Sequence, residues 1–230
     1  MIQARNTFPA DTGVDPTCDG VRGMLPEETV TAWEVLAPLM PKSAYLAGDT
    51  GLTVRLGHRV SDDLEFFLER REDLDALWSV FKSAGKRLRS EGRDERLSFL
   101  LNGTKVQVIE ASSERLISRT SRVAGVRVAS VEDIMAAKID VICTGGALRD
   151  YFDLMCIERR VGLLAEAAIA LAVYKYERRD AEGFVLAVLR SLGGFYDVKD
   201  DPSLAVSRDE IQSYWLHRQI EVARRLEAFS

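Results

Sequence analysis

The chain has 230 residues, of which 47% are hydrophobic and 29% charged, and a formal net charge of −5 at pH 7. This size suits one large domain or two modest ones with a proper core. Its three cysteines, Cys18, Cys143 and Cys156, lack CxxC spacing, which argues against a disulfide framework and against a zinc site. The sequence starts without an apolar stretch of signal-peptide length, and its most apolar segment, residues 163–173, is too short to span a bilayer. We therefore expect a soluble, cytoplasmic protein without a membrane partner.

The N-terminal region divides into an arm and a helix. Residues 1–24 are rich in Gly, Pro, Asp and Thr without any period, which predicts a loosely structured arm. Pro26, followed by Glu27 and Glu28 in the first turn, begins a predicted helix. The apolar face of this helix consists of Val30, Trp33, Ala37 and Met40.

A glycine turn follows the first predicted strand, residues 44–47. The turn reads Ala-Gly-Asp-Thr-Gly and leads into a short predicted helix over residues 50–57. The amides at a helix N-terminus attract phosphate, so this turn is a candidate phosphate site. The residues expected to contact the phosphates here are Gly48, Asp49 and Thr50.

An acid–apolar–acid triplet opens the second predicted strand, residues 64–68. Asp63 and Glu65 are two residues apart, so both carboxylates project from one face of a strand while Leu64 points into the core. Carboxylates held this close repel each other unless a cation lies between them, and such hard oxygen ligands suit Mg²⁺ or Mn²⁺. Magnesium bound by carboxylates and substrate phosphates is the chemistry of nucleotidyl transfer. The alternative is a solvent-facing pair on an edge strand; the upstream glycine turn favours the metal site.

A second amphipathic helix and several short strands complete the first half of the chain. The helix places Leu74, Leu77, Trp78 and Phe81 on one face. The dipeptide Asn102-Gly103 between two strand candidates is a strong hairpin signal. Strands are predicted at residues 86–89, 97–101, 105–109 and 126–129.

Residues 82–127 are basic in an otherwise acidic chain. They contain eleven Lys or Arg against five Asp or Glu, a local charge of +6. If folding gathers these charges, they form an electrostatic footprint for phosphate-rich RNA. If it does not, they are an ordinary solvated surface, and the sequence leaves both interpretations open.

From Ser130 onward the sequence reads as helix throughout. Ser130 and Asp133 have the spacing of a capping box, which begins a helix there. The apolar stripe of this helix includes Lys138, an ammonium group where a core residue is expected. Because lysine is rarely buried without a partner, Lys138 either extends to the surface or reaches a polar group across a cleft.

The next predicted helix carries a charged group of its own. It follows Gly145-Gly146 and contains Arg149, Asp150 and Asp153. Arg149 and Asp153, at i,i+4, have the spacing of a plain surface ion pair. Asp150 and Asp153 share a face at i,i+3, so they can act at a cleft instead.

The glycine turn, short helix and acid–apolar–acid strand resemble the nucleotidyltransferase superfamily. Residues 59–67, Arg-Val-Ser-Asp-Asp-Leu-Glu-Phe-Phe, resemble the R-x-S-x-D-h-D signature of the AbiEii/AbiGii family, the toxins of bacterial abortive-infection (type IV toxin–antitoxin) systems. The second block of that family has a Lys on a helix, then Arg-Asp and a further Asp. Lys138, the pair Arg149-Asp150, and Asp153 match this block, in the right order.

The resemblance implies a fold and a reaction. The fold is α+β: after the arm at 1–24, a small mixed sheet with flanking helices over residues 25–129, then a helical domain over residues 130–230. The reaction is Mg²⁺-dependent transfer of an NMP from an NTP to an acceptor hydroxyl, with release of pyrophosphate. By the same resemblance, the acceptor is the 3′ end of tRNA or another RNA, and an antitoxin protein is a partner.

The resemblance also assigns roles to residues. Asp63 and Glu65 bind the metal, and Lys138 neutralises charge that develops on the phosphates. Asp150 and Asp153 are the remaining candidate catalytic acids. The nucleotide-binding set is Gly48, Asp49, Thr50, Arg59, Ser61, Lys138 and Arg149, where Ser61 either contacts phosphate or holds its loop.

Two departures from the family pattern keep other functions open. Asp49 stands where the turn usually has Gly or Ser, and an acid there repels a triphosphate unless it is bound to a metal or turned away. Gln107 occupies the slot of a third carboxylate and cannot accept a proton at neutral pH. Either Asp150 or Asp153 substitutes for that carboxylate, or catalysis is slow or lost. The alternatives are therefore an antibiotic-modifying nucleotidyltransferase and a catalytically impaired relative that binds nucleotide or a partner.

Overall fold

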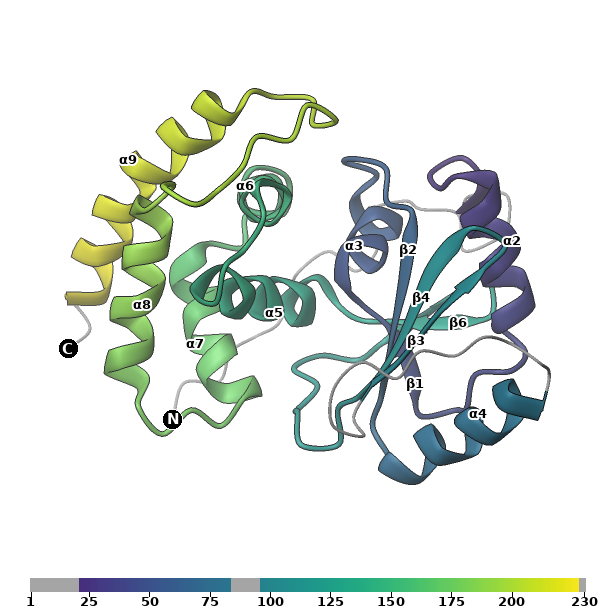
Figure 1. Ribbon diagram of the computed structural model, residues 1–230. Helices are drawn as coiled ribbons and strands as arrows, with labels where there is room; N and C mark the ends of the chain where they lie inside the picture. The colour runs from purple at the N-terminus through teal and green to yellow at the C-terminus, as the bar shows by residue number, and fades with distance from the viewer. Residues whose placement is uncertain (1–20, 84–95, 228–230) are drawn as a thin grey trace.

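The computed structural model describes residues 21–83 and 96–227, which form a mixed sheet with flanking helices and a separate group of helices (Figure 1). The described sheet is six-stranded, in the order β3-β4-β2-β1-β6-β5. Strand β2 pairs in parallel with β4, and β1 with β6, while the other neighbours are antiparallel. The strands are β1 Ala44–Leu46, β2 Asp63–Leu68, β3 Arg96–Leu101, β4 Thr104–Glu110, β5 Ser121–Val123 and β6 Val126–Val128.

Three helices pack on this sheet: α2 Glu27–Leu36, α3 Gly48–Leu56 and α4 Arg71–Ser83. The apolar faces of α2 and α4 bury Trp33 and Phe81 against one face of the sheet. Helix α3 lies at the side of β2 that faces the other helices, and it contacts both β2 and α5 (Figure 1). The glycine turn at its start is thereby placed between the two halves of the molecule.

The side chains of β2 alternate between two environments, as the sequence predicts. Leu64, Phe66 and Leu68 are fully buried in the core shared with α2 and α4. Asp63, Glu65 and Phe67 face the opposite side of the sheet and are partly exposed. The period of two therefore places both predicted metal ligands on one face.

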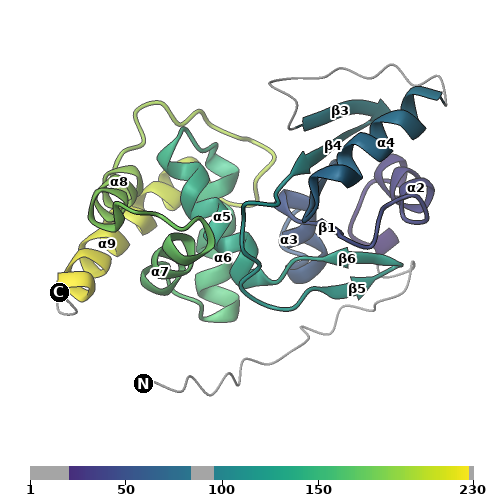
Figure 2. The same ribbon diagram turned by 90° about the horizontal axis from the view of Figure 1, so that it is seen from below.

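The second half of the chain is helical, and it begins where the sequence predicts. The Ser130 hydroxyl accepts a hydrogen bond from the Asp133 amide (3.0 Å), which caps α5 at its N-terminus. Viewed from below in Figure 2, these helices gather at one end of the sheet. Their core also contains Tyr45, Ala47 and Leu52 from the first half. The helices are α5 Val131–Cys143, α6 Leu148–Val161, α7 Ala165–Lys175, α8 Ala181–Gly193 and α9 Arg208–Glu227.

Several boundaries differ from the sequence prediction. Helix α3 begins at Gly48, two residues early, because the Gly51 amide already bonds to the Ala47 carbonyl (2.9 Å). Val21, assigned to the loose arm, is helical and buried in the core. The second half is not helical throughout, since residues 194–207 form an irregular connection. The strand predicted at 86–89 lies outside the described residues.

The sequence analysis missed strand β5. The hairpin that joins β5 to β6 turns at Ala124 and Gly125, both with positive φ. Alanine rarely adopts that conformation, so this turn carries none of the signal of Asn102-Gly103, whose hairpin between β3 and β4 is confirmed. A strand of three residues, Ser-Arg-Val, is also too short for a visible alternation.

The sheet separates the basic residues of segment 82–127 that the structure describes. Arg96 and Lys105 lie on β3 and β4 at one edge, whereas Arg122 and Arg127 lie on β5 and β6 at the other. A single continuous tract is therefore not formed by these four residues. Within the described residues, no helix has the length and apolar character needed to cross a membrane.

Candidate active site

A cavity of about 460 Å³ lies between the sheet and the second group of helices. Its volume is in the range of small-molecule sites. The start of α3 and strand β2 form one side, while α5, α6 and α7 form the other. Its charged lining residues are Asp49, Asp63, Glu65, Arg96, Glu114, Asp133, Lys138, Asp140, Arg149, Asp150 and Lys175.

The glycine turn approaches the β2 carboxylates so closely that only glycine fits. A Cβ atom on Gly48 would lie 1.9 Å from Glu65 Oε2, and Gly48 has φ +61°, which disfavours any other residue. The Ala47 amide also donates to the Glu65 carbonyl (3.0 Å). The turn is therefore pinned beside Asp63 and Glu65, with the N-terminus of α3 directed at the same cavity.

Two hydroxyl groups hold the Asp63 loop in place. The Ser61 hydroxyl donates to Asp63 Oδ1 (3.2 Å), and the Thr50 hydroxyl donates to the Asp63 carbonyl. Thr50 and Ser61 are buried, and their own oxygens lie 2.7 Å apart. Of the two roles left open for Ser61, this geometry fits the one that fixes the loop, and it gives Thr50 the same role instead of phosphate contact by its side chain.

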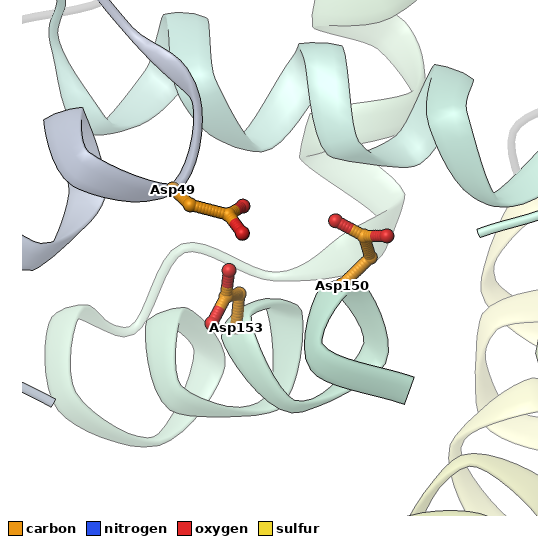
Figure 3. Close-up of side chains that lie close together, drawn as sticks. All are labelled: Asp49, Asp150 and Asp153. Atoms are coloured by element: carbon orange, nitrogen blue, oxygen red, sulfur yellow. The ribbon is translucent and has the colours of Figure 1, made fainter. Parts of the chain in front are cut away.

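Lys138 is buried among three carboxylates. Its Nζ lies 2.6 Å from Asp49 Oδ1, 2.8 Å from Asp150 Oδ1 and 2.7 Å from Asp153 Oδ2. Figure 3 shows these three carboxylates converging on one point from α3 and α6. Lys138 thus does not extend to the surface; it joins the glycine turn to the second group of helices.

Two arginines complete this cluster. Arg59 binds both oxygens of Asp153 (2.6 and 2.7 Å) and also Asp49 (2.8 Å), while Arg149 binds Asp49 (3.0 Å). Arg149 therefore pairs with Asp49, and the surface pair with Asp153 suggested by spacing is wrong. Three cations thus match the three carboxylates of Asp49, Asp150 and Asp153.

This charge balance decides where a metal ion fits. The oxygens of Asp49, Asp150 and Asp153 lie within 4.8 Å of one another, a spacing that suits a cation, but Lys138 Nζ already occupies that position. Asp63 and Glu65, in contrast, form no ion pair with any residue that the structure describes. A carboxylate pair that forms no direct ion pair, on one strand face and open to a cavity, is a donor set that a hard divalent cation satisfies.

The pKa values of two of the ion-paired acids and of the β2 carboxylates shift in opposite directions. Burial disfavours the Asp49 and Asp153 carboxylates, yet Lys138 and Arg59 outweigh this effect and hold both pKa values below the usual range. Burial raises the pKa of Asp63, and burial together with Asp63 and Asp49 raises the pKa of Glu65 to about 7. The pair on β2 is thus costly to ionise, whereas the ion-paired acids stay charged.

Gln107 lies beside Glu65 on the neighbouring strand, as the third-carboxylate slot requires. The parallel register of β2 and β4 sets Glu65 opposite Gln107. In the amide orientation that satisfies its neighbours, Gln107 donates to Glu65 Oε1 (3.2 Å) and accepts from Arg96 (3.2 Å). The Gln107 amide therefore orients Glu65 by a hydrogen bond. A carboxylate at position 107 would instead repel the Glu65 carboxylate.

Glu65→Gln is expected to stabilise the protein at alkaline pH when no divalent cation is present. A carboxyl whose folded pKa is raised from 4.5 to about 7 favours folding while it is protonated, so stability is lost as pH rises through 7. The neutral amide removes this loss, and we expect a gain of about 1–3 kcal/mol at pH 8 that vanishes near pH 4. Thermal melts across this pH range, with the exposed Glu28→Gln as control, measure the effect. An equal gain at both pH values would contradict it.

The structure also brings in residues that the sequence analysis did not identify. His58 is buried, and its Nε2 lies 2.7 Å from Asp153 Oδ1, so it helps to fix the acid that holds Lys138. The sequence feature that could have identified His58 is its position directly before Arg59, the first residue of the R-x-S-x-D stretch. Three aromatic residues also line the cavity, and no local motif marks them: Tyr45 on β1, Phe67 on β2 and Tyr176 directly after α7.

Comparison with known proteins agrees with this arrangement. Residues 36–228 match the family described as nucleotidyl transferase AbiEii toxin, type IV toxin–antitoxin system. The uncharacterized protein aq_aa25 of Aquifex aeolicus is 29% identical over 175 residues, which cover 74% of this chain and 80% of that protein.

Two solved structures share the fold. MenT4, a nucleotidyltransferase toxin of Mycobacterium tuberculosis H37Rv, has a TM-score of 0.58 and 16% identity over 88% of this chain and 87% of its own. JHP933 from Helicobacter pylori has a TM-score of 0.52 and 18% identity over 89% of this chain and 95% of its own. At these identities the similarity extends to the fold.

Proposed function

The chain belongs to the AbiEii family of nucleotidyl transferase toxins of type IV toxin–antitoxin systems, and we propose that it transfers an NMP from an NTP to the 3′ end of tRNA in a Mg²⁺-dependent reaction. The observation that supports metal dependence is the pair Asp63 and Glu65, which forms no direct ion pair within the described residues. An antitoxin encoded beside it, which the family implies, is its proposed protein partner.

The charge of the whole cavity supports the same proposal. Among the residues that the structure describes, seven carboxylates and four cationic side chains line it, and their net charge is −3 when all are ionised. The triphosphate of an NTP is itself strongly anionic, so this cavity repels it unless divalent cations enter with it. We place the triphosphate at the start of α3, where the helix N-terminus favours anions.

In the proposed reaction the acceptor oxygen bonds to the α-phosphorus, and the bond from that phosphorus to the bridging oxygen breaks. Pyrophosphate leaves with that oxygen. A divalent cation held by Asp63 and Glu65 would supply Lewis-acid polarisation of the α-phosphate. Gly48 allows the turn to approach, and the first amides of α3 orient the phosphates. Arg149, half exposed beside the same cavity, is the proposed contact for the departing pyrophosphate.

We assign Asp49, Asp150 and Asp153 to positioning. Asp150 also accepts a bond from the Ala147 amide (2.9 Å) at the start of α6, and Asp153 is fully buried. Asp49 and Asp153, whose pKa values Lys138 and Arg59 lower, are poor proton acceptors because their ionised forms are already stabilised. In this proposal the acceptor proton therefore leaves to solvent, and Lys138 acts mainly by fixing the glycine turn against α6.

The decisive experiment incubates the protein with each α-labelled NTP and Mg²⁺, together with total tRNA or a panel of aminoglycoside and lincosamide antibiotics. Label in tRNA that depends on Mg²⁺ supports the proposal. Label in an antibiotic would replace it with the small-molecule function. NTP binding without transfer to any acceptor would favour the impaired relative, for which Gln107 is the sequence argument.

Lys105→Gln is expected to weaken labelling of tRNA several-fold without affecting NTP binding. Lys105 is exposed and lies opposite Asp63 in the register of β2 and β4, so it is placed to contact the phosphates of an RNA entering the site. Loss of one phosphate contact also makes the salt dependence less steep. Labelling at several salt concentrations measures both effects, and Arg122→Gln at the opposite edge of the sheet is the control. Equal losses in both variants would contradict RNA entry along β4.

A further inference from the structure

We propose that the buried end of the cavity is the subsite for the nucleobase of the incoming NTP, an inference that rests on the proposed function. This end lies beyond Glu65, away from the glycine turn. It is lined by the three aromatic residues Tyr45, Phe67 and Tyr176, with polar groups around them.

The strand register places the residues of this subsite in one row. Arg96 pairs with Ile109, Ile109 with Phe67, and Phe67 with Tyr45, so these four residues form one row across β3, β4, β2 and β1. The Tyr45 and Phe67 rings stack with centroids 5.6 Å apart and an interplanar angle of 18°. The row is therefore aromatic and apolar at its centre, with a guanidinium at its edge.

The distance between the proposed metal site and the aromatic row matches the size of one nucleotide. Phe67 is two residues from Glu65 on the same face of β2, which corresponds to roughly 6.6 Å along the strand. A ribose bridges a gap of this size between an α-phosphate held at Asp63 and Glu65 and a base lying over Phe67. The aromatic row thus lies one sugar away from the reacting phosphorus.

Polar groups accompany the aromatic row. Tyr45 and Tyr176 line the cavity, and each phenol can donate and accept a hydrogen bond. Glu114 lines the cavity as well, and its carboxylate forms an ion pair with the Lys175 ammonium (3.5 Å). Two phenols and a carboxylate therefore offer hydrogen-bonding groups to a ligand in this part of the cavity. A nucleobase edge, with donors and acceptors on a flat ring, is such a ligand.

The burial of the residues at this end of the cavity indicates that the NTP, and not the acceptor, binds there. Tyr45, Asp133 and Lys175 are almost completely buried, and the Lys175 ammonium is held by Asp133 (3.3 Å). A mononucleotide base fits such an enclosed end, whereas a polymer needs an open path. Arg149 and Lys105, both exposed, mark the more open part of the site, where the acceptor is expected.

The test compares ligands with and without a base. Tyr45→Phe combined with Tyr176→Phe removes both hydroxyls and keeps the rings, and Phe67→Leu removes one ring and keeps an apolar side chain. Binding of each NTP and of inorganic tripolyphosphate is measured by calorimetry with Mg²⁺. We expect both proteins to bind NTP about tenfold or more weakly than the parent, because base stacking and base hydrogen bonds are lost, and to bind tripolyphosphate as the parent does. Phe99→Leu, which removes a buried ring on the opposite face of the sheet, is the control.

Parental affinity for every NTP in both variants would overturn the subsite. Equal weakening of NTP and tripolyphosphate would overturn it as well, because it would show a general distortion of the site. Failure of the proposed function is a different result: the parent protein would then bind NTP without transferring its NMP to tRNA, or would bind neither NTP nor tripolyphosphate with Mg²⁺. A change in KM for NTP without a change in KM for tRNA would be a second sign that the aromatic row holds the base and not the acceptor.

Discussion

Asp63→Asn is expected to lower nucleotide transfer by about 10³-fold and to leave the protein folded. The amide keeps the shape of the side chain and an oxygen that accepts from Ser61, but it removes the charge that, with Glu65, attracts a divalent cation. Because burial and the nearby Asp49 make the ionised Asp63 costly, the variant should melt no lower than the parent. Transfer is followed with an α-labelled NTP, and folding by circular dichroism and thermal melting.

Asp62→Asn is the matched control for this variant. Asp62 is the adjacent acid, but its side chain is exposed and does not line the cavity. It should retain parental activity. Full transfer by the Asp63→Asn protein, or a comparable loss in both variants, would remove the carboxylate pair from the mechanism.

Lys138→Met is expected to destabilise the protein by about 3–5 kcal/mol, because it leaves three buried carboxylates without their shared counter-charge. For a chain of this length, such a change lowers the melting temperature by roughly 10 °C. The apolar stripe of α5 by itself predicts the opposite: a methionine at that position should be neutral or stabilising. The structure overturns that expectation, since the lysine is 4% exposed and fully paired.

Two further proteins make this prediction specific. Lys199→Met removes an exposed ammonium and should melt as the parent does. Lys138→Met combined with Asp150→Asn leaves one fewer unpaired charge, so it should recover part of the lost stability. A Lys138→Met protein that melts with the parent would show that the three acids find other partners, and that Lys138 does not join α3 to α5 and α6.

The sequence by itself determined the features that depend on neighbouring residues. The period of two along β2 placed Asp63 and Glu65 on one face, because alternation is a property of any strand. Gly48 marked a turn, and Ser130 marked the start of α5, because caps and turns form within a few residues. The family signature rests on the same short spacings, which is why the glycine turn with residues 59–67, together with the second block from Lys138 to Asp153, indicated nucleotidyl transfer.

Only the tertiary structure decided what the charged side chains do. Asp49 and Lys138 are 89 residues apart, and their ion pair exists because α5 and α6 pack against the start of α3. No local pattern encodes that packing, so spacing alone paired Arg149 with the wrong acid and left Lys138 undecided between the surface and a cleft. The aromatic row is likewise a product of register across four strands. Local chemistry thus identified the candidate metal ligands, while long-range packing determined which acids are already neutralised and therefore which pair is left to bind a cation.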